Sequence, residues 1–424
     1  MKSFNTISVV GLGYIGLPTA AMFASKEKKV IGVDVSQYTV ATINAGKIHI
    51  VEPELDVMVQ KAVDGGFLKA TTTPEPADAF LIAVPTPFLP FKNQDFIPEP
   101  DLSYIKSAAK SVAKVLKKGD LVVLESTSPV GATEQMSAWL AEERSDLSFP
   151  QTHGEDSDIR IAHCPERVLP GHVVRELVEN NRVIGGMTEI CSTAAIELYK
   201  IFVNGDCIVT SARTAEMAKL TENASRDVSI AFANELSIIC DTLDIDVWEL
   251  IKIANCHPRV NILQPGPGVG GHCIAVDPWF IVSSAPRKAK LIKAARKVND
   301  HKPKWVVDKV KIAITDILQS NPQKCVEDIV VACFGLSFKA NIDDLRESPS
   351  LLIAQKITEF HKGKVLGVEP NVSRLPGIQN IELVSFDVAE ARADIALLLV
   401  DHEEFRVTGA PDVSVIVDFK GIWS

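Results

Sequence analysis

The segment from Gln264 to Phe280, QPGPGVGGHCIAVDPWF, gathers glycines around a single cysteine, Cys273, and places Asp277 four residues after it. Glycine-rich loops bring backbone amides close to a ligand, and such amides can stabilise an oxyanion. A thiolate in that setting can attack a carbonyl carbon. We therefore predict that Cys273 is a catalytic nucleophile. The alternative is that it behaves as a small buried hydrophobe, which is the usual fate of a cysteine.

The same region offers a second chemistry, because the pairs Cys256-His257 and His272-Cys273 contain four residues that could bind zinc. Two adjacent-residue pairs separated by a glycine-rich stretch match no common structural zinc pattern. We therefore expect no metal here.

Three polar residues, Lys219, Asn223 and Arg226, fall at i, i+4 and i+7 of a predicted helix that includes residues 215–243. This spacing places them on one helix face. Such a row is ordinarily a solvated stripe. A helix with so many apolar residues should be mostly covered, so the row can equally line a cleft, and the residues alone leave both interpretations open.

The N-terminal run ISVV leads directly into Gly11-Leu12-Gly13-Tyr14-Ile15-Gly16, and the next strand ends at Asp34, 18 residues beyond Gly16. Glycines permit a tight turn and close approach to a pyrophosphate, which then meets the unpaired N–H groups of a helix N-terminus. Asp34 would bind the ribose 2′-hydroxyl and repel a 2′-phosphate. The pattern predicts NAD binding by Gly11, Gly13, Tyr14, Ile15, Gly16 and Asp34. Glycines that serve only helix–strand packing are the alternative.

Later strand ends supply further candidates, because ligands of open α/β sheets lie beyond the carboxyl ends of the strands. AFLIAV is followed by Thr86, LVVLES by Thr127, and IRIAHC by Glu166 and Arg167. We predict that Thr86 and Thr127 donate hydroxyl hydrogen bonds to cofactor or substrate. A plain cap is the more common use of a threonine at a strand end.

The order of elements predicts the architecture that must position these residues. Short β-branched runs alternate with helical stretches at the start of the chain and again after Asn321-Pro322, where IVVACFGL, KVLGV, IALLLV and VSVIV follow. The fold class is α/β, with two Rossmann-like doubly wound parallel-sheet domains joined by a helical middle domain. The predicted domains are 1–210, 211–318 and 319–424. The last one lacks a GxGxxG, so any nucleotide there must be held differently.

Composition excludes several classes of protein. Forty-four basic and 54 acidic residues give a net charge of −10, so we expect no nucleic-acid partner and no binding to anionic lipid. The sequence contains no run of about 18 apolar residues, so we predict no membrane span. The eight cysteines are scattered without a CxxC pair, which favours a reducing cytoplasm. An apolar N-terminus that ends in AMFA imitates a signal peptide, but its regular glycines argue against that interpretation.

Seven segments carry a resemblance to a known family: GLGYIGLP, VPTP, LESTSPVG, CPERVLPG, AEMAKLTENASRDVSIAFANE, HPRVNILQPGPGVGGHCIAVDP and FGLSFKANIDDLRESP. In their order and spacing, over nearly the whole chain, they resemble the UDP-glucose/GDP-mannose dehydrogenase family. The resemblance implies an N-terminal NAD-binding domain, a helical middle domain that forms a homodimer, and a C-terminal domain that binds UDP. It implies oxidation of a sugar's C6 alcohol to a carboxylate in two steps.

The resemblance also implies roles for individual residues. Cys273 forms the covalent adduct, Lys219 and Asn223 surround the reacting oxygen, and Asp277 and Glu166 handle protons or water. Arg346 contacts the cofactor, and Arg259 reaches the site of the neighbouring subunit. The substrate contacts are Arg167, Val168, Lys219, Asn223, Arg226, His257, Arg259, Gly270 and Lys339.

Within the family, the glycine-rich loop GPGVGGHCIAVDPWF around Cys273 differs from the GFGGSCF type of UDP-glucose members. This difference favours UDP-N-acetyl-D-mannosamine as substrate. UDP-N-acetylglucosamine and UDP-glucose are the alternatives. The product would be a uronate for polysaccharide biosynthesis, such as that of enterobacterial common antigen. Two features depart from the family pattern: the loop FLPFKNQDFIPEPD is long, and Cys256 stands where a basic residue is expected.

Two rival functions share parts of this pattern. A single-step NAD dehydrogenase of a hydroxy acid shares the N-terminal fold and a helical second domain, but it has no use for Cys273 or a third domain. An NAD-responsive sensor would bind the cofactor without turning over a UDP-sugar.

Overall fold

The structure is a computed structural model that describes residues 4–50, 52–90, 97–168, 171–271, 273–375 and 377–423. The chain divides into two compact units. The first comprises Met1–Glu222 with Ser283–Pro286, and the second comprises Asn223–Val282 with Arg287–Ser424. Among the described residues, no helix has the length and apolar character needed to cross a membrane.

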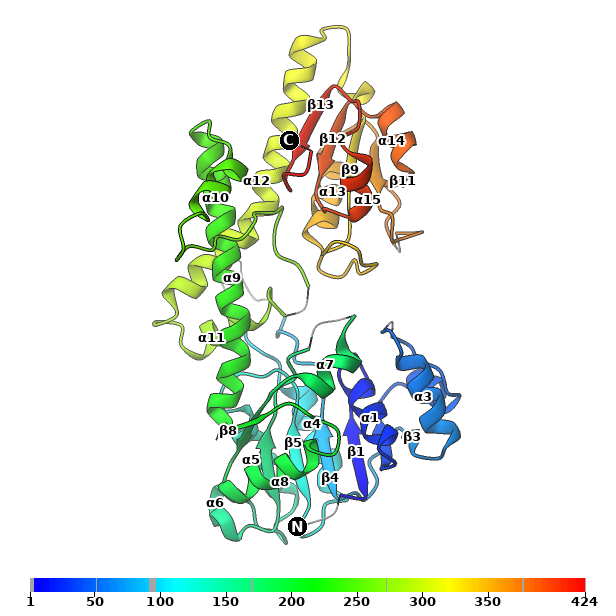
Figure 1. Ribbon diagram of the computed structural model, residues 1–424, viewed down its shortest axis with the longest axis vertical. Coiled ribbons are helices and arrows are strands. Elements are labelled where there is room, and N and C mark those ends of the chain that lie inside the picture. The colour runs from blue at the N-terminus through cyan, green and yellow to red at the C-terminus, as the bar shows by residue number, and fades with distance from the viewer. Residues whose placement is uncertain are drawn as a thin grey trace. The chain divides into compact units, whose positions relative to one another are not determined.

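The first unit is built on an eight-stranded sheet in the order β3-β2-β1-β4-β5-β6-β7-β8 (Figure 1). Neighbouring strands are parallel except β6 and β7, which pair antiparallel. The strands are β1 (Thr6–Val10), β2 (Lys29–Val33), β3 (Leu68–Thr71), β4 (Ala79–Ile82), β5 (Leu121–Leu124), β6 (Arg160–His163), β7 (Arg182–Gly186) and β8 (Cys207–Ser211).

Helices cover both faces of this sheet. Successive strand residues point to opposite faces, so Val9 packs into a core that includes Phe23 of α1, whereas Val10 packs into one that includes Leu140 of α5. The helices are α1 (Gly16–Ser25), α2 (Gln37–Asn44), α3 (Leu55–Asp64), α4 (Ser103–Ala113), α5 (Ala132–Glu143), α6 (Pro150–His153), α7 (Val173–Glu179) and α8 (Glu189–Tyr199), with the short 3-10 turn Gly154–Asp156.

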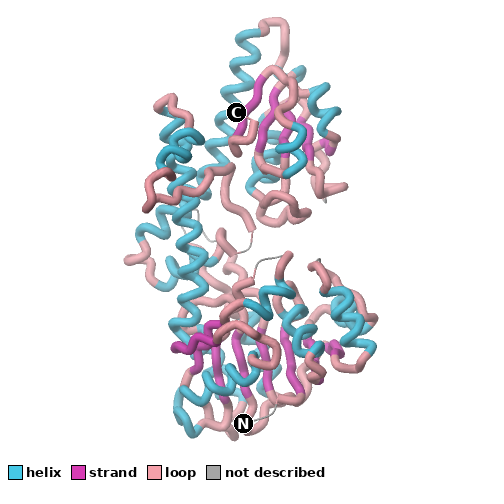
Figure 2. Tube along the Cα trace, viewed as in Figure 1, coloured by secondary structure: helices cyan, strands magenta, loops and turns pink. Residues whose placement is uncertain are grey.

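The region after β8 is helical. It contains the 31-residue helix α9 (Ala212–Thr242), then α10 (Val247–Ala254), α11 (Asp277–Ser284) and the 31-residue helix α12 (Lys290–Ser320). Figure 2 shows this stretch as helix and loop, with no strand among its described residues. The first residues of α9 belong to the first unit and the rest to the second.

A second sheet follows, in the order β11-β10-β9-β12-β13, with all pairs parallel. One face packs on α12 and α13 and the other on α14 and α15. The elements are the 3-10 turn Val326–Asp328, β9 (Val331–Phe334), α13 (Pro349–Phe360), β10 (Val365–Val368), β11 (Glu382–Leu383), α14 (Phe386–Arg392), β12 (Ile395–Leu398), α15 (Glu403–Thr408) and β13 (Val415–Asp418).

The predicted fold class is confirmed, since one doubly wound sheet precedes the helical region along the chain and a second sheet follows it. The antiparallel pairing of β6 and β7 is an addition that the sequence pattern did not indicate. The long loop after Pro87 lies partly outside the described residues, because residues 91–96 are not described.

Candidate active site

The glycine loop after β1 has the shape that a dinucleotide requires. Gly11 has a φ of +92°, and a Cβ on it would lie 2.5 Å from the carbonyl oxygen of Ala83. A Cβ on Gly16, the first residue of α1, would lie 1.7 Å from the carbonyl oxygen of Gly11. A Cβ on Gly13 would meet nothing within 4 Å, so the open side of the loop lies there. The loop therefore fits a pyrophosphate against the N-terminus of α1.

No side chain caps that helix end, and its first turn holds no acid. Ile15 stands at the N-cap position and is half-buried, while Tyr14 is 38% exposed. Asp34 follows β2, and its two carboxylate oxygens accept hydrogen bonds from the amides of Leu12 (3.0 Å) and Ser36 (2.9 Å). Asp34 thus ties the glycine loop to the end of β2, where a ribose would be bound.

The threonines after β4 and β5 meet each other. Thr86 donates its hydroxyl to the carbonyl oxygen of Thr127 at 2.5 Å. The loop after Thr127 is held by buried Glu216 of α9, whose carboxylate accepts the amides of Gly131 (2.6 Å) and Thr133 (2.8 Å). The role of Glu216 was not predicted from the sequence, because an acidic residue on one helix gives no sign that it caps the start of another helix far away in the chain.

Glu166 follows β6 and is buried, although a lone carboxylate prefers water. Arg182 of β7 supplies the compensating charge through a contact between its Nη1 and Oε2 of Glu166, and the amide of Arg167 donates to Oε1 at 2.7 Å. The ammonium of Lys219 donates to the main-chain oxygen of Glu166. Lys219 and Glu166, two of the predicted catalytic residues, are thus brought together by this hydrogen bond.

The titratable groups around this pair are buried as well. Burial, the largest single effect, lowers the pKa of Arg182, but the acidic groups around it, with Glu166 the strongest, together raise that pKa above its usual value. Burial, followed by the nearby charge of Glu166, raises the pKa of Glu125 to about 7. Tyr199 donates its hydroxyl to Glu125 at 2.6 Å. Burial also lowers the pKa of His163 to about 3, with the charge of Lys219 as a second cause.

Cys273 is exposed and lies in the turn that leads into α11. Its carbonyl oxygen accepts the amides of Val276 (3.1 Å) and Asp277 (2.9 Å), which fixes the turn. The preceding glycines lie against the second sheet domain: a Cβ on Gly270 would be 2.5 Å from the carbonyl oxygen of Glu347, and one on Gly271 would be 3.1 Å from the ring of Phe338. His272 lies outside the described residues.

Asp277 begins α11 and is buried beneath this turn. Asn223 of α9 donates from Nδ2 to Oδ2 of Asp277 at 2.5 Å. Asn223, Asp277 and the backbone turn at Cys273 thus form one hydrogen-bonded group in the second unit.

A buried polar cluster supports the start of the glycine loop. Asn234 of α9 accepts the amide of Gly266 at 2.9 Å and donates to Asn299 of α12 at 2.9 Å. Asn299 in turn donates to Asp227 (2.8 Å), which also accepts from Arg296 (2.6 Å). This cluster was missed from the sequence, because charged residues on a helix usually indicate a solvated face.

The remaining substrate-side predictions are spread over both units. Arg167 pairs with Glu222 at 2.6 Å, and Val168 packs against the apolar core of the first unit. Arg226 is exposed. His257 and Arg259 are exposed in the loop after α10, where the amide of Arg259 donates to Nδ1 of His257 at 3.4 Å.

Lys339 and Arg346 lie in the loop between β9 and α13. Lys339 is exposed, and Arg346 pairs with Asp344 at 2.6 Å. Arg346 also lines a cavity of about 540 Å³ together with Arg374 and Asn371. Among the described residues, no three His, Cys, Asp or Glu side chains are grouped to hold a metal.

Comparison with known proteins supplies an independent test. The chain matches three models of the UDP-glucose/GDP-mannose dehydrogenase family: the NAD binding domain at residues 5–203, the central domain at 213–301 and the UDP binding domain at 332–424.

Full-length relatives are similar throughout. The chain is 63% identical over 424 residues to the NDP-N-acetyl-D-galactosaminuronic acid dehydrogenase of Ralstonia nicotianae, covering 99% of this chain and 97% of that one. It is 61% identical over 427 residues to the UDP-N-acetyl-D-mannosamine dehydrogenase of Escherichia coli, covering 99% and 100%.

A solved structure of the UDP-N-acetyl-mannosamine dehydrogenase Cap5O from Staphylococcus aureus is 40% identical, with a TM-score of 0.81 and coverage of 98% and 95%. The UDP-D-ManNAc dehydrogenase of Pyrococcus horikoshii is 36% identical, with a TM-score of 0.83 and coverage of 99% and 96%.

Proposed function

Because the chain belongs to the UDP-glucose/GDP-mannose dehydrogenase family, we propose that it oxidises C6 of UDP-N-acetyl-D-mannosamine to the carboxylate in two steps, with NAD as electron acceptor. The observation that carries the proposal is the exposed thiol of Cys273, on a turn fixed by Asp277 and preceded by glycines. The relatives named for UDP-N-acetyl-D-mannosamine support the choice of sugar.

The first oxidation needs a group that takes the proton of the C6 hydroxyl. Lys219, or a water held by Asp277, fills that role, and both residues are already oriented by hydrogen bonds to Glu166 and Asn223. NAD at the Gly11–Gly16 loop supplies the hydride acceptor for each oxidation. The product of this step is an aldehyde.

The second oxidation begins when the thiolate of Cys273 attacks the aldehyde carbon and forms a thiohemiacetal. Lys219 and Asn223 stabilise the oxyanion, since both carry N–H donors. Covalent capture retains the aldehyde and turns its oxidation into loss of a hydride from a tetrahedral carbon. The resulting thioester is hydrolysed by water activated by Glu166, which breaks the carbon–sulfur bond and releases the thiolate.

Substrate contacts are assigned to Arg167, Val168, Arg226, His257, Arg259, Gly270 and Lys339, and Arg346 is assigned to the cofactor. We further infer a homodimer in which Arg259 acts in the partner's site, in keeping with its exposure. The scattered cysteines favour a cytoplasmic enzyme, and the uronate product suits synthesis of a surface polysaccharide such as enterobacterial common antigen.

A second candidate substrate is favoured by one observation. Relatives at 63% identity are named NDP-N-acetyl-D-galactosaminuronic acid dehydrogenase. The galacto sugar differs in the orientation of substituents on the ring and has the same C6 alcohol. The same thiol chemistry would therefore apply to it.

The test is to count NADH formed per sugar consumed for UDP-N-acetylmannosamine, UDP-N-acetylgalactosamine, UDP-N-acetylglucosamine and UDP-glucose. We expect two NADH per sugar and the highest kcat/KM with UDP-N-acetylmannosamine. A ratio of one would reduce the protein to an ordinary alcohol dehydrogenase, and NAD binding without turnover of any of the four sugars would favour a sensor.

A further inference from the structure

The second sheet domain repeats the nucleotide-binding turn of the first. Gly11 and Gly335 follow the first strand of each domain, with φ of +92° and +86°. Each donates its amide at 2.8 Å to the last residue of the neighbouring strand, Val33 and Val368 respectively. An acid comes next in both cases, Asp34 and Glu369. The two turns therefore place a carboxylate at the same point, where a dinucleotide fold binds ribose.

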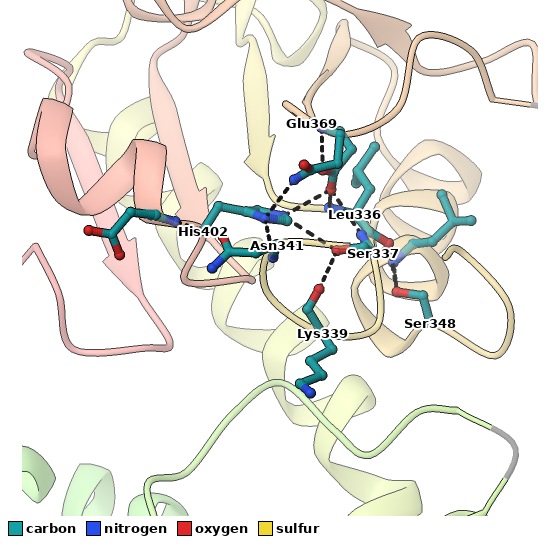
Figure 3. Close-up of polar contacts among 10 residues, drawn as sticks. Leu336, Ser337, Lys339, Asn341, Ser348, Glu369 and His402 are labelled. Atoms are coloured by element: carbon teal, nitrogen blue, oxygen red, sulfur yellow. Dashed lines mark hydrogen bonds and ion pairs between the residues drawn. The ribbon is translucent and has the colours of Figure 1, made fainter. Parts of the chain in front are cut away.

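The two carboxylates differ in what surrounds them. Asp34 accepts two backbone amides and stays partly exposed. The side chain of Glu369 has no exposed surface, and its oxygens accept the amides of Leu336 (2.7 Å), Ser337 (3.0 Å) and Asn371 (3.1 Å). His402, with a side chain that is likewise 0% exposed, contacts the same carboxylate at 3.1 Å (Figure 3). His402 thus takes the place that a ribose would need.

The contacts of His402 fix its tautomer. Nδ1 lies 3.0 Å from the amide nitrogen of Asn341 and 3.1 Å from Nδ2 of Asn371, and a backbone amide can only donate. Nδ1 is therefore the acceptor, and the ring proton lies on Nε2. Nε2–H donates to Glu369, with the hydroxyl of Ser337 at 3.4 Å as a second acceptor.

These contacts hold both sides of Lys339. On one side, the Ser337 hydroxyl accepts from Nε2–H of His402 and donates a hydrogen bond to the carbonyl oxygen of Lys339 at 2.7 Å. On the other side, Asn341 has the left-handed φ of +62° that asparagine tolerates, and its amide is bound to Nδ1. The Asn341 side chain also accepts the amide of Glu403 at the start of α15. The chain around exposed Lys339 is thus fixed at two points that meet on one imidazole, as Figure 3 shows.

We propose that His402 is a positioning residue for the UDP-sugar: it closes the Glu369 carboxylate to ribose and holds the loop Gly335–Asn341 so that Lys339 is presented to the diphosphate. The inference rests on the proposed function through the role given to Lys339. It adds a residue from the far end of the chain, which the glycine and lysine motifs do not indicate.

The experiment uses three substitutions of the full-length protein and one control. His402→Asn keeps an acceptor near the position of Nδ1, His402→Gln keeps a donor near Nε2, and His402→Phe keeps neither. His361→Asn is the matched control, because His361 is also buried in this domain and its Nε2 contacts the carbonyl oxygen of Ile329 at 2.8 Å. Binding of UDP is measured by calorimetry, and KM and kcat are measured with NAD and the UDP-sugar.

We expect His402→Phe to weaken UDP binding about tenfold and to raise KM for the UDP-sugar by a similar factor, since two hydrogen bonds to the loop are lost. The Asn and Gln variants should each recover part of that loss, with kcat and KM for NAD changed less than about twofold. Unchanged UDP affinity in a folded His402→Phe protein, or an equal loss in His361→Asn, would overturn the proposal. If the wild-type protein bound no UDP, the proposed function itself would be wrong.

A second measurement is independent of UDP binding. Selective ¹⁵N labelling of histidine should show the ring proton of His402 on Nε2 and a hydrogen-bond acceptor at Nδ1 in the wild-type protein, and His402→Asn identifies the signal. A ring protonated on Nδ1 at neutral pH would contradict the proposed bond to the Asn341 amide.

Discussion

Nη1 of Arg182 contacts Oε2 of Glu166 inside the first unit, where the two side chains are 3% and 5% exposed. Removing one member of a buried pair leaves an uncompensated charge. Arg182→Met should therefore lower the free energy of unfolding by about 3 to 5 kcal/mol, measured by denaturant titration. Arg175→Met is the control, because it breaks the exposed pair of Arg175 with Glu179 (77% and 56% exposed) and should change the free energy of unfolding far less. Equal losses in both variants would show that the buried pair has no special role.

The buried carboxyl of Glu125 predicts a pH dependence of stability. Its pKa is raised to about 7 by burial, and an unfolded glutamate titrates at about 4.3. Because the pKa of Glu125 is raised in the folded state, the contribution of this carboxyl to stability is fully present below the unfolded pKa and is lost as pH rises through about 7. Glu125→Gln removes this titration and retains an acceptor for Tyr199. The stability of the variant relative to wild type should thus increase as the pH is raised from 5 to 8. A difference independent of pH would contradict the burial argument.

Asn234 links α9, α12 and the glycine loop through its bonds to Asn299 and to the amide of Gly266. Asn234→Ala leaves that amide and Asn299 without these bonds, which should cost about 1 to 3 kcal/mol in unfolding free energy. We also expect a lower kcat, because the loop carries Cys273. Ser229→Ala, at an exposed position of the same helix, should change neither quantity. Full activity in Asn234→Ala would show that the cluster supports the fold without positioning the thiol.

Cys273→Ser should abolish formation of the carboxylate while NAD binding survives, since the hydroxyl is a much weaker nucleophile than a thiolate. The matched control is Cys256→Ser, which removes another exposed thiol from the same unit. NAD affinity by fluorescence titration and product analysis by mass spectrometry are the measurements. Retention of the full double oxidation in Cys273→Ser would refute the assignment of the nucleophile.

The sequence predicted those parts of the fold in which local pattern and tertiary structure agree. All nine predicted strands exist. Eight of them are largely buried apolar runs, as a parallel strand inside a sheet requires, whereas β13 lies partly exposed at the edge of its sheet. β7 was missed because RVIGG ends in two glycines, and β8 because CIVTS lies partly exposed at the edge of its sheet.

The candidate site divides in the same way. Gly11, Asp34 and Cys273 could be predicted, because the spacing of glycines and the end of a strand can be recognised from neighbouring residues in the sequence. Arg182, Glu216 and His402 were missed, since their role depends on partners 16 to 85 residues away that only folding brings near. From the sequence alone, a buried charged residue cannot be distinguished from one on the surface unless its partner is known.

The covalent step can be observed directly. Wild-type protein is mixed with NAD and UDP-N-acetylmannosamine, quenched with acid during turnover, and digested, and the peptide that contains Cys273 is weighed by mass spectrometry. We predict a sugar-nucleotide acyl adduct on Cys273 that disappears when substrate is exhausted. Formation of two NADH and the carboxylate with no adduct on this cysteine, or with the adduct on another one, would contradict the central claim.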